Sequence, residues 1–179
     1  MNETALPFAT PAVPVLVTER LVLSAPVLAD FEHAAAYHAS DRGVWEGGPY
    51  HRHHAWRIWA ADVALWMLKG YGPFRVASRE TGEWLGEVGI FHGDEFPEAE
   101  LGWMVAPHAE GKGYAAEAAR AVMLWVRQHF GWDDIINIID PRNSRSIALA
   151  LRLGGRIDTK RAGIDAGDVV IVHDLRGLA

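Results

Sequence analysis

The chain contains no cysteine, and this absence excludes disulfide bonds, thiolate metal sites and a cysteine nucleophile. Long hydrophobic runs are also missing, since no apolar stretch reaches the roughly 20 residues that a membrane-spanning helix needs. The first residues, MNETALPFATPA, lack the basic start and apolar run of a signal peptide. We therefore expect a cytoplasmic protein with no membrane partner.

The chain has fewer basic than acidic residues. The chain has 17 Lys and Arg against 23 Asp and Glu, which gives a net charge of −6. Because nucleic-acid binding needs a basic face, this balance argues against nucleic acid as a partner. An acidic protein attracts cationic partners instead, and an amine is one such partner.

Length and composition bound the organisation of the chain. With 179 residues, half of them hydrophobic, the chain has the size and composition of one globular domain. Proline and small residues near the start predict a flexible tail over residues 1–12, followed by a single domain over residues 13–179. No internal repeat or low-complexity segment interrupts that domain.

Hydrophobic periodicity predicts a strand and two helices in the first part of the chain. The strand covers residues 15–25, the helices cover residues 28–40 and 53–70, and a loop at residues 46–50 lies between the helices. Gly70 stands where a helix C-cap is expected. The core face predicted for the second helix consists of Trp56, Trp59, Val63, Trp66 and Met67.

Beyond Gly70 the pattern changes to strands followed by alternating helices and strands. Thr81-Gly82 marks a hairpin turn, and Asn143 is a predicted helix N-cap. The expected class is α+β, with a single mixed, mostly antiparallel sheet of about six to seven strands flanked by helices. The predicted strands are 73–80, 83–93, 100–107, 133–140, 155–161 and 168–175, and the predicted helices are 114–130 and 143–155.

The segment HAEGKGYAAEA, residues 108–118, predicts an anion site. The first N–H groups of a helix have no partner within the helix, and they lie at the positive end of its dipole. Gly111 and Gly113 let the backbone approach an anion closely, and Lys112 adds a charge. These features suit a phosphate or pyrophosphate. A strand-to-helix turn that uses glycine only for tight packing is the alternative.

Three ligand classes compete for this turn. The pattern GxxxxGK[ST] is absent, so a nucleoside-triphosphate loop is disfavoured. Gly111, Gly113 and Ala116 match the loose dinucleotide pattern GxGxxG/A. That pattern belongs near the first strand of a parallel fold, whereas here predicted antiparallel hairpins precede it. Coenzyme A is the third class.

The sequence resembles the GNAT N-acyltransferases at two linked segments. They are ELGWMVAPHAEGKGYAAEAARAVMLWV and IIDPRNSRSIALALRLGGR, which place the glycine turn about thirty residues before Asn143, Ser146 and Gly154. The opening TERLVLSAP and the GGPY loop resemble the branch of ribosomal-protein N-terminal acetyltransferases (RimJ/RimL-type). The resemblance covers residues 15–175 and implies the GNAT fold, in which two neighbouring strands splay apart.

The resemblance implies acetyl-CoA as cosubstrate and defines its site. The strand ending at Met104 and Val105 would part from strand 135–139, and the pantetheine arm would lie in the gap. The pyrophosphate would bind the backbone N–H groups of the glycine turn, Asn143 would reach the pantetheine or acetyl end, and Ser146 would lie near the sulfur. The implied turn residues are Gly111, Lys112, Gly113, Tyr114 and Ala115.

One position departs from the resembled family. Glu110 stands where the family usually has Gln or Arg, three residues before Gly113. A carboxylate does not help to bind a pyrophosphate. We expect its side chain to face solvent, because the contacts of the turn are mainly from the backbone.

Transfer of an acetyl group to an amine needs a base, because a free alkylamine is mostly protonated at pH 7. Glu100, at the start of the strand that leads to the turn, is the predicted base, acting directly or through water. The alternative is that Glu100 is only a charged residue at the edge of a strand and has no catalytic role. Glu98 and Asp94, on the adjacent loop, are rival candidates.

The reaction also needs an oxyanion donor and an acid. A backbone N–H near Val105 would serve as the donor. Some relatives protonate the thiolate with a tyrosine seven residues after the Asn, but here that position is Ala150. We predict that Ser146 takes this role; a first-turn helix residue with a capping partner is the alternative.

Histidine and aromatic residues mark the acceptor side. The motif HRHH (51–54) invites a metal hypothesis, but it lacks a second ligand cluster at zinc spacing, and we expect no metal. In the resembled family this region forms the wall of the acceptor pocket, which implies that Trp45, Tyr50 and His54 contact the substrate.

The preferred hypothesis is an acetyl-CoA-dependent N-acetyltransferase that acts by direct transfer in a ternary complex. Its acceptor would be a primary amine, whether a protein N-terminus, an amino acid or a small amine. Ala150 and Glu110 keep open a non-catalytic CoA-binding module of the same fold, and a dinucleotide-binding enzyme is disfavoured by the order of elements. Dimers are common in the resembled family, so a homodimer also stays open.

Overall fold

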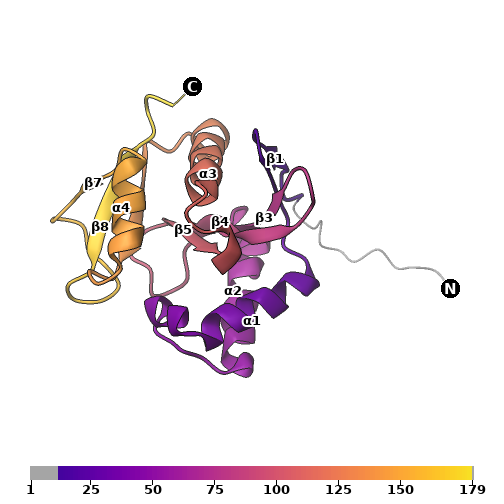
Figure 1. The fold of residues 1–179 in the computed structure, drawn as a ribbon. Coiled ribbons are helices and arrows are strands. Elements are labelled where there is room, and N and C mark those ends of the chain that lie inside the picture. Colours follow the sequence, from indigo (N-terminus) through magenta and orange to yellow (C-terminus); the bar gives the residue numbers. More distant parts are fainter. Residues whose placement is uncertain (1–11, 179) are drawn as a thin grey trace.

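A computed structural model describes residues 12–178. The tail predicted over residues 1–12 therefore lies outside the described residues except for Ala12, as does Ala179 at the end of the predicted domain. Figure 1 shows the fold, whose elements in chain order are β1 (Leu16–Val17), β2 (Leu21–Ser24), α1 (Phe31–Ala39), α2 (Arg52–Lys69), β3 (Pro73–Ser78), β4 (Trp84–Phe91), β5 (Glu100–Val105), α3 (Tyr114–Phe130), β6 (Asp134–Ile139), α4 (Ser144–Arg152), β7 (Arg156–Ile157) and β8 (Val169–Asp174).

The strands form one sheet in the order β1-β2-β3-β4-β5-β6-β8-β7. Only the β5–β6 pair is parallel among these described strands, so the α+β class and the mixed, mostly antiparallel sheet are confirmed. The sheet has eight strands, because the segment expected as one strand over residues 15–25 folds back on itself. Thr18 makes that turn by accepting a hydrogen bond on its hydroxyl from the Leu21 N–H, 3.0 Å away.

Helices cover both faces of the sheet. In Figure 1, α1 and α2 lie together on one side, while α3 and α4 lie on the other. The predicted inner face of α3 is confirmed at Ala119, Val122 and Val126, which are fully buried, whereas Ala115 in the first turn is only partly buried. This first turn is the end of α3 that stands closest to the candidate anion site.

The predicted core face of α2 is partly wrong. Trp59 and Trp66 are buried, but Trp56 is 42% exposed and Met67 is 64% exposed. Apolar residues occur almost all round this helix, so its sequence does not select one face. Ala55 and Leu65 are buried as well. Trp56 instead packs edge-on against Phe31 of α1, with ring centroids 4.8 Å apart.

The last predicted hairpin is shorter than expected. Strand β7 has two residues and pairs with β8, whereas the prediction extended to residue 161. Arg161 lies away from the sheet ladder because its guanidinium forms ion pairs with Asp134, at 2.7 Å, and Glu98, at 3.0 Å. A loop of residues 159–167 follows β7, and its Ile164 and Asp165 line the cavity described below.

Candidate functional site

A glycine turn begins helix α3. Gly111 and Gly113 have φ angles of 71° and 83°, in the left-handed region that favours glycine. Gly113 is the N-cap of α3 and supplies no side-chain hydrogen bond. The first N–H groups of the helix are therefore free of a side-chain cap and can bind an anion together with the helix dipole.

Arg20 lies beside this turn, and sequence reasoning missed it. Its guanidinium donates to the Lys112 carbonyl at 3.0 Å and lies 4.7 Å from the centre of the Tyr114 ring. An ion pair of 2.7 Å with Glu117 holds it there. The turn between β1 and β2 thus delivers a cation to the start of α3. No local motif marks this role, because 92 residues separate the partners.

Glu110 does not face solvent as expected. Its carboxylate pairs with Arg42 at 2.5 Å and with Arg145 at 2.6 Å, and it is 23% exposed. Two guanidinium groups therefore surround one carboxylate, so the local charge at the turn remains positive despite this acid. Arg42 also donates to the Val105 carbonyl at 2.8 Å, which ties the segment before α2 to the end of β5.

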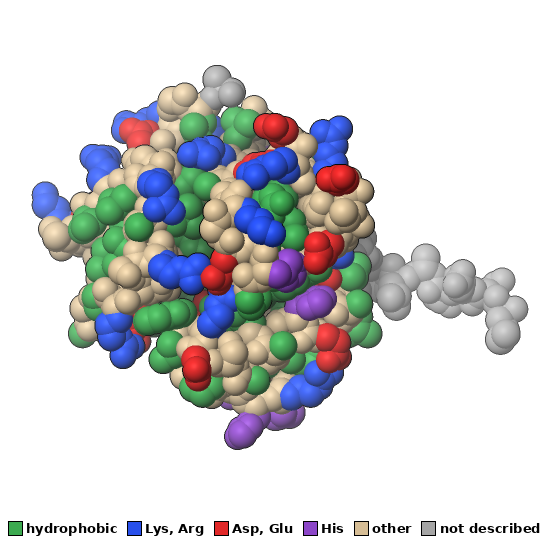
Figure 2. Space-filling view, viewed as in Figure 1, with side chains coloured by type: hydrophobic (Ala, Val, Ile, Leu, Met, Phe, Trp, Pro, Cys, Tyr) green, Lys and Arg blue, Asp and Glu red, His purple; other side chains and the backbone are tan. Residues whose placement is uncertain are grey.

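The surroundings of the turn are basic although the chain as a whole is acidic. Figure 2 shows Lys and Arg side chains gathered on this face, over α3, α4 and the segment that joins β5 to α3. Among the described residues, Arg20, Arg42, Lys112 and Arg145 are the cations that stand at the turn or bind its neighbours. This distribution suits a phosphate-bearing ligand at the start of α3.

The predicted splay of two strands is present between β5 and β6. Strands β5 and β6 are joined by one register pair, Glu100 opposite Ile136. On its other edge, β5 pairs with β4 along the whole length of β5. Asn137 bridges the closed end of the gap, because its amide donates to the Leu101 carbonyl and its oxygen lies 2.6 Å from His173 Nε2. Past this point the backbone edges of both strands are open to a ligand.

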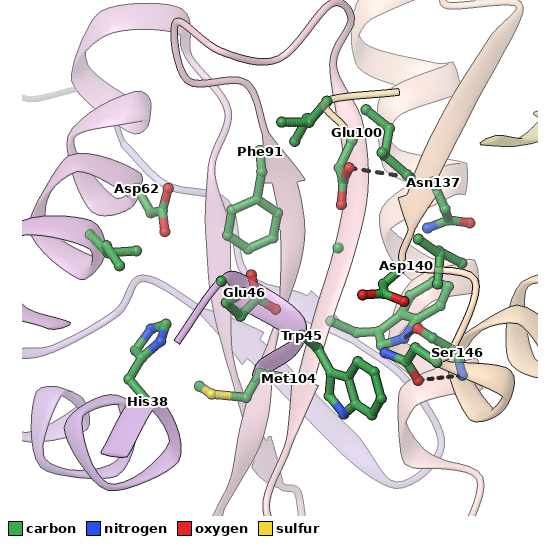
Figure 3. Close-up of a pocket in the computed structure, with 18 of the residues that line it drawn as sticks. His38, Trp45, Glu46, Asp62, Phe91, Glu100, Met104, Asn137, Asp140 and Ser146 are labelled. Atoms are coloured by element: carbon green, nitrogen blue, oxygen red, sulfur yellow. Dashed lines mark hydrogen bonds between the residues drawn. The ribbon is translucent and has the colours of Figure 1, made fainter. Parts of the chain in front are cut away.

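A cavity of about 550 Å³ lies at this gap and extends toward α1 and α2. Figure 3 shows Glu100, Asp140 and Ser146 on the strand side, with Asp62 and His38 across the cavity on the helix side. The cavity gathers seven of the predicted site residues. They are Trp45, Tyr50, His54, Glu100, Met104, Asn143 and Ser146. The predicted Val105 and the turn residues Gly111 to Ala115 do not line it; they continue the β5 segment toward the start of α3.

Glu100 is a partly buried carboxylate that lines the cavity. One oxygen accepts a hydrogen bond from the Ile138 N–H at 3.2 Å. Burial raises the pKa of Glu100 well above its usual range, and the carboxylates of Glu46, Asp168 and Asp62 raise it further. A carboxylate with a raised pKa can accept a proton near neutral pH.

The rival bases are placed differently. Glu98 is held in an ion pair of 3.0 Å with Arg161, and neither Glu98 nor Asp94 lines the cavity. Asp94 is exposed on the loop between β4 and β5. Of the three candidate carboxylates, Glu100 is therefore the one that faces the cavity.

Ser146 lies in the first turn of α4, where the Asn143 side chain accepts a hydrogen bond from the Ser146 N–H at 3.2 Å and caps the helix as predicted. The Ser146 hydroxyl accepts a hydrogen bond from the Trp103 indole at 2.8 Å. Because an indole only donates, the hydroxyl proton of Ser146 is left for another acceptor. Ala150 is fully buried against Ile139 and Ile171.

The cavity contains the predicted aromatics. Tyr50 and His54 stack with ring centroids 4.2 Å apart, and Trp45 is 37% exposed at the same cavity. Sequence reasoning missed two acids, Asp62 and Glu87, that line the same cavity. Burial raises the pKa of Asp62 to about 7 and that of Glu87 to about 8. Glu87 alternates with apolar residues on β4 and is the one charged residue in that strand, which is the signal that could have found it.

Within residues 12–178, no group of three or more His, Cys, Asp or Glu side chains is arranged to hold a metal ion. The histidines of the HRHH motif are exposed at the start of α2. In the same described part of the chain, no helix has the length and apolarity to cross a membrane.

Residues 20–156 match the model of the acetyltransferase (GNAT) domain. The chain belongs to the GNAT acetyltransferase family. It is 37% identical to a solved acetyltransferase from Agrobacterium tumefaciens strain C58, with a TM-score of 0.86 and coverage of 96% of this chain and 99% of that one.

Two further proteins are similar to the chain. The chain is 36% identical over 90 residues to the uncharacterized protein YkkB of Bacillus subtilis strain 168; this covers 48% of the chain and only 52% of that relative. RimL, the ribosomal L7/L12 alpha-N-protein acetyltransferase, was solved with coenzyme A. It shares 13% identity, with a TM-score of 0.69 over 90% of this chain and 98% of that one, a likeness of fold alone.

Proposed function

We propose that this GNAT protein is an N-acetyltransferase that moves the acetyl group of acetyl-CoA to a primary amine, by direct transfer in a ternary complex. One observation carries the proposal: strand β5 begins at a partly buried carboxylate in the cavity, Glu100, and leads through Val105 to an uncapped helix start at Gly113. A base and an anion site thus stand at the two ends of one open strand edge.

The residues present fit acetyl-CoA. Its pyrophosphate would bind the backbone N–H groups from Gly111 to Ala115, with Lys112 and the nearby arginines offsetting its charge. Its pantetheine would lie along Met104 and Val105, where β5 and β6 have parted, and would approach Asn143 and Ser146. When bound, the cosubstrate supplies a thioester carbon that an amine can attack.

The side chains in the cavity supply the proton transfers. Glu100 takes the proton that the amine loses, directly or through water, as the C–N bond forms. Ser146 passes its hydroxyl proton to the sulfur as the C–S bond breaks and takes a proton from water in the same step, while the Trp103 indole holds the hydroxyl oxygen in place. Ser146 therefore fills the acid role that Ala150 cannot perform, and a backbone N–H near Val105 stabilises the oxyanion.

The acceptor is a primary amine held against Trp45, Tyr50 and His54. The family membership supports acetyl transfer, and the coenzyme A complex of RimL supports the cosubstrate. We further propose that the protein acts in the cytoplasm without metal, nucleic acid or membrane, and that it forms a homodimer.

Titration calorimetry with acetyl-CoA, beside NADPH as control, tests the cosubstrate. We expect binding of acetyl-CoA alone. Release of free CoA thiol in the presence of a panel of amines then tests turnover. Binding without thiol release for every amine would identify a non-catalytic CoA-binding module, and binding of NADPH instead would restore the dinucleotide hypothesis.

A further inference from the structure

Unpaired carboxylates dominate the cavity. Asp140 is neutralised by Arg142 at 2.5 Å, and Arg142 is the one Lys or Arg among the described residues that line the cavity. The other acids of the lining form no salt bridge with a residue of the described chain. They are Glu46, Asp62, Glu87, Glu95, Glu100, Asp165 and Asp168.

The imbalance matters most where the carboxyl group is buried. Glu87 is the one buried acid of this set, at 6% exposure, whereas the similarly buried Asp30 outside the cavity, with its side chain 3% exposed, pairs with Arg75 at 3.0 Å. Glu110 has two arginines. A buried carboxylate is costly unless it is paired or protonated. No Lys or Arg of the described chain pairs with the carboxylates of that set, so a cation that balances them would have to come from a ligand.

Two of these acids, Glu87 and Glu100, stand at two positions on one face of the sheet. In the register of β4 and β5, Phe91 stands opposite Glu100 and Glu87 stands opposite Met104, so these four side chains share one face of the sheet. The two positions are four residue steps apart on β5, which is about 13 Å along the strand. Glu87 accepts a hydrogen bond from Trp59 of α2 at 3.1 Å, and Asp62 projects from α2 on the same helix side (Figure 3).

His38 gives independent evidence for a ligand at the helix end. It is 7% exposed, it lines the cavity, and its Nδ1 has no hydrogen-bond partner. Figure 3 shows its ring directed from α1 toward the cavity. Burial lowers the pKa of His38, with a further contribution from His54, so the ring is neutral at pH 7. A neutral imidazole has one nitrogen that accepts a hydrogen bond.

We propose that the acceptor is a small diamine or polyamine, with one amine beside Glu100 and a second ammonium group held at the helix end by Asp62, Glu87 and His38. This inference rests on the proposed acetyltransferase function and names its substrate class. The second ammonium supplies the missing cation, and its N–H groups have two carboxylates and the imidazole as acceptors. The aromatic rings of Trp45 and Tyr50 also line the cavity and can pack against a cationic chain.

The same electrostatics disfavour other amines. A free amino acid would bring its own carboxylate into a site that already holds unpaired acids, and a monoamine would leave the helix end without a cation. A protein N-terminus would place neutral peptide groups there. The structure therefore assigns the strongest preference to a substrate with positive charge at both ends.

Three acceptors with the same six-carbon chain provide the test: hexamethylenediamine, hexylamine and ε-aminocaproic acid. Initial rates of CoA thiol release at saturating acetyl-CoA give kcat/KM for each. We expect the diamine to exceed hexylamine at least about tenfold, and the amino acid to fall below hexylamine by a similar factor. Equal values for diamine and monoamine, with normal turnover, would overturn the substrate assignment and leave the acetyltransferase function standing.

Variants locate the preference within the cavity. Asp62→Asn and, separately, Glu87→Gln should raise KM for hexamethylenediamine about tenfold and reduce its advantage over hexylamine. Glu80→Gln makes the same carboxyl-to-amide substitution at an exposed position outside the cavity and should keep the wild-type advantage. An undiminished advantage in both cavity variants would refute the proposed position of the second ammonium.

Direct titration separates this inference from the proposed function. Calorimetry with hexamethylenediamine and with hexylamine, each in the absence of acetyl-CoA, measures the acceptor site alone. Tighter binding of the diamine would support the inference even if no acetyl transfer were found. Equal or undetectable binding of both amines, in a protein that binds and turns over acetyl-CoA, would count against it.

Discussion

One oxygen of the Glu100 carboxylate lies 3.2 Å from the backbone nitrogen of Ile138. In a regular parallel pair, the Ile138 N–H would donate to a carbonyl of the neighbouring strand. Here a side chain of β5 takes the place of that carbonyl, at the point where β5 and β6 part. The same carboxylate therefore closes the end of the gap and stands at the proposed reaction site.

Replacement of Glu100 by Gln should lower turnover at pH 7 by about 100-fold and by less at pH 9, because at pH 9 a larger fraction of the amine is already neutral. Acetyl-CoA affinity should not change, since Glu100 does not contact the glycine turn. The measurements are kcat against pH and acetyl-CoA titration. Glu98→Gln is the control, because Glu98 is paired with Arg161; an unchanged rate in the Glu100 variant would remove it as the base.

Substitution of Gly113 by Asp should abolish acetyl-CoA binding. The residue has a φ of 83°, which strains any side chain, and a carboxylate there would repel the pyrophosphate. Gly82→Asp imposes a comparable backbone strain, at a φ of 72°, in the exposed turn between β3 and β4. We expect that control to bind acetyl-CoA normally. Calorimetry would contradict the assignment of the turn if the Gly113 variant still bound.

Glu110→Gln should tighten acetyl-CoA binding by about threefold to tenfold. Loss of the carboxylate frees Arg42 and Arg145 to pair with phosphate oxygens, and removes one negative charge from the turn. The increase should shrink at high salt, because these groups are partly exposed. Titration at two salt concentrations measures both effects. Weaker binding in this variant would instead mean that Glu110 positions the two arginines.

Ser146→Ala should lower kcat about tenfold and leave KM for the amine nearly unchanged, because the change removes the proposed proton donor and no acceptor contact. Trp103→Phe is the matched control, since it removes the indole that bonds the hydroxyl but keeps the hydroxyl itself. Its kcat should fall less. A larger loss in the Trp103 variant than in the Ser146 variant would show that packing at Trp103, and not the hydroxyl, governs the rate.

The sequence was sufficient where local patterns determine structure. Glycine at 113 and 131 set the two ends of α3, which has the predicted bounds of Tyr114 and Phe130, and Asn143 capped α4. Local sequence patterns could not predict the contacts between segments that are distant in the chain. Arg20 reaches Lys112 and Arg42 reaches Val105 across long stretches of chain, and no periodicity encodes such contacts. The burial of Glu87 beside Trp59 likewise depends on how α2 packs on the sheet.

Glu87 also predicts how stability depends on pH. Burial raises its pKa from 4.5 to about 8 in the folded protein, so the folded state keeps a proton that the unfolded chain releases. Its contribution to the free energy of unfolding is therefore complete below pH 4.5 and is lost as the pH rises to about 8. Glu87→Gln keeps an acceptor for the Trp59 indole and cannot ionise. Denaturant unfolding should show the variant gaining a few kcal/mol over wild type at pH 9 relative to pH 6, whereas exposed Glu80→Gln should show no such gain. Parallel pH curves for wild type and Glu87→Gln would mean that the buried carboxyl keeps an ordinary pKa.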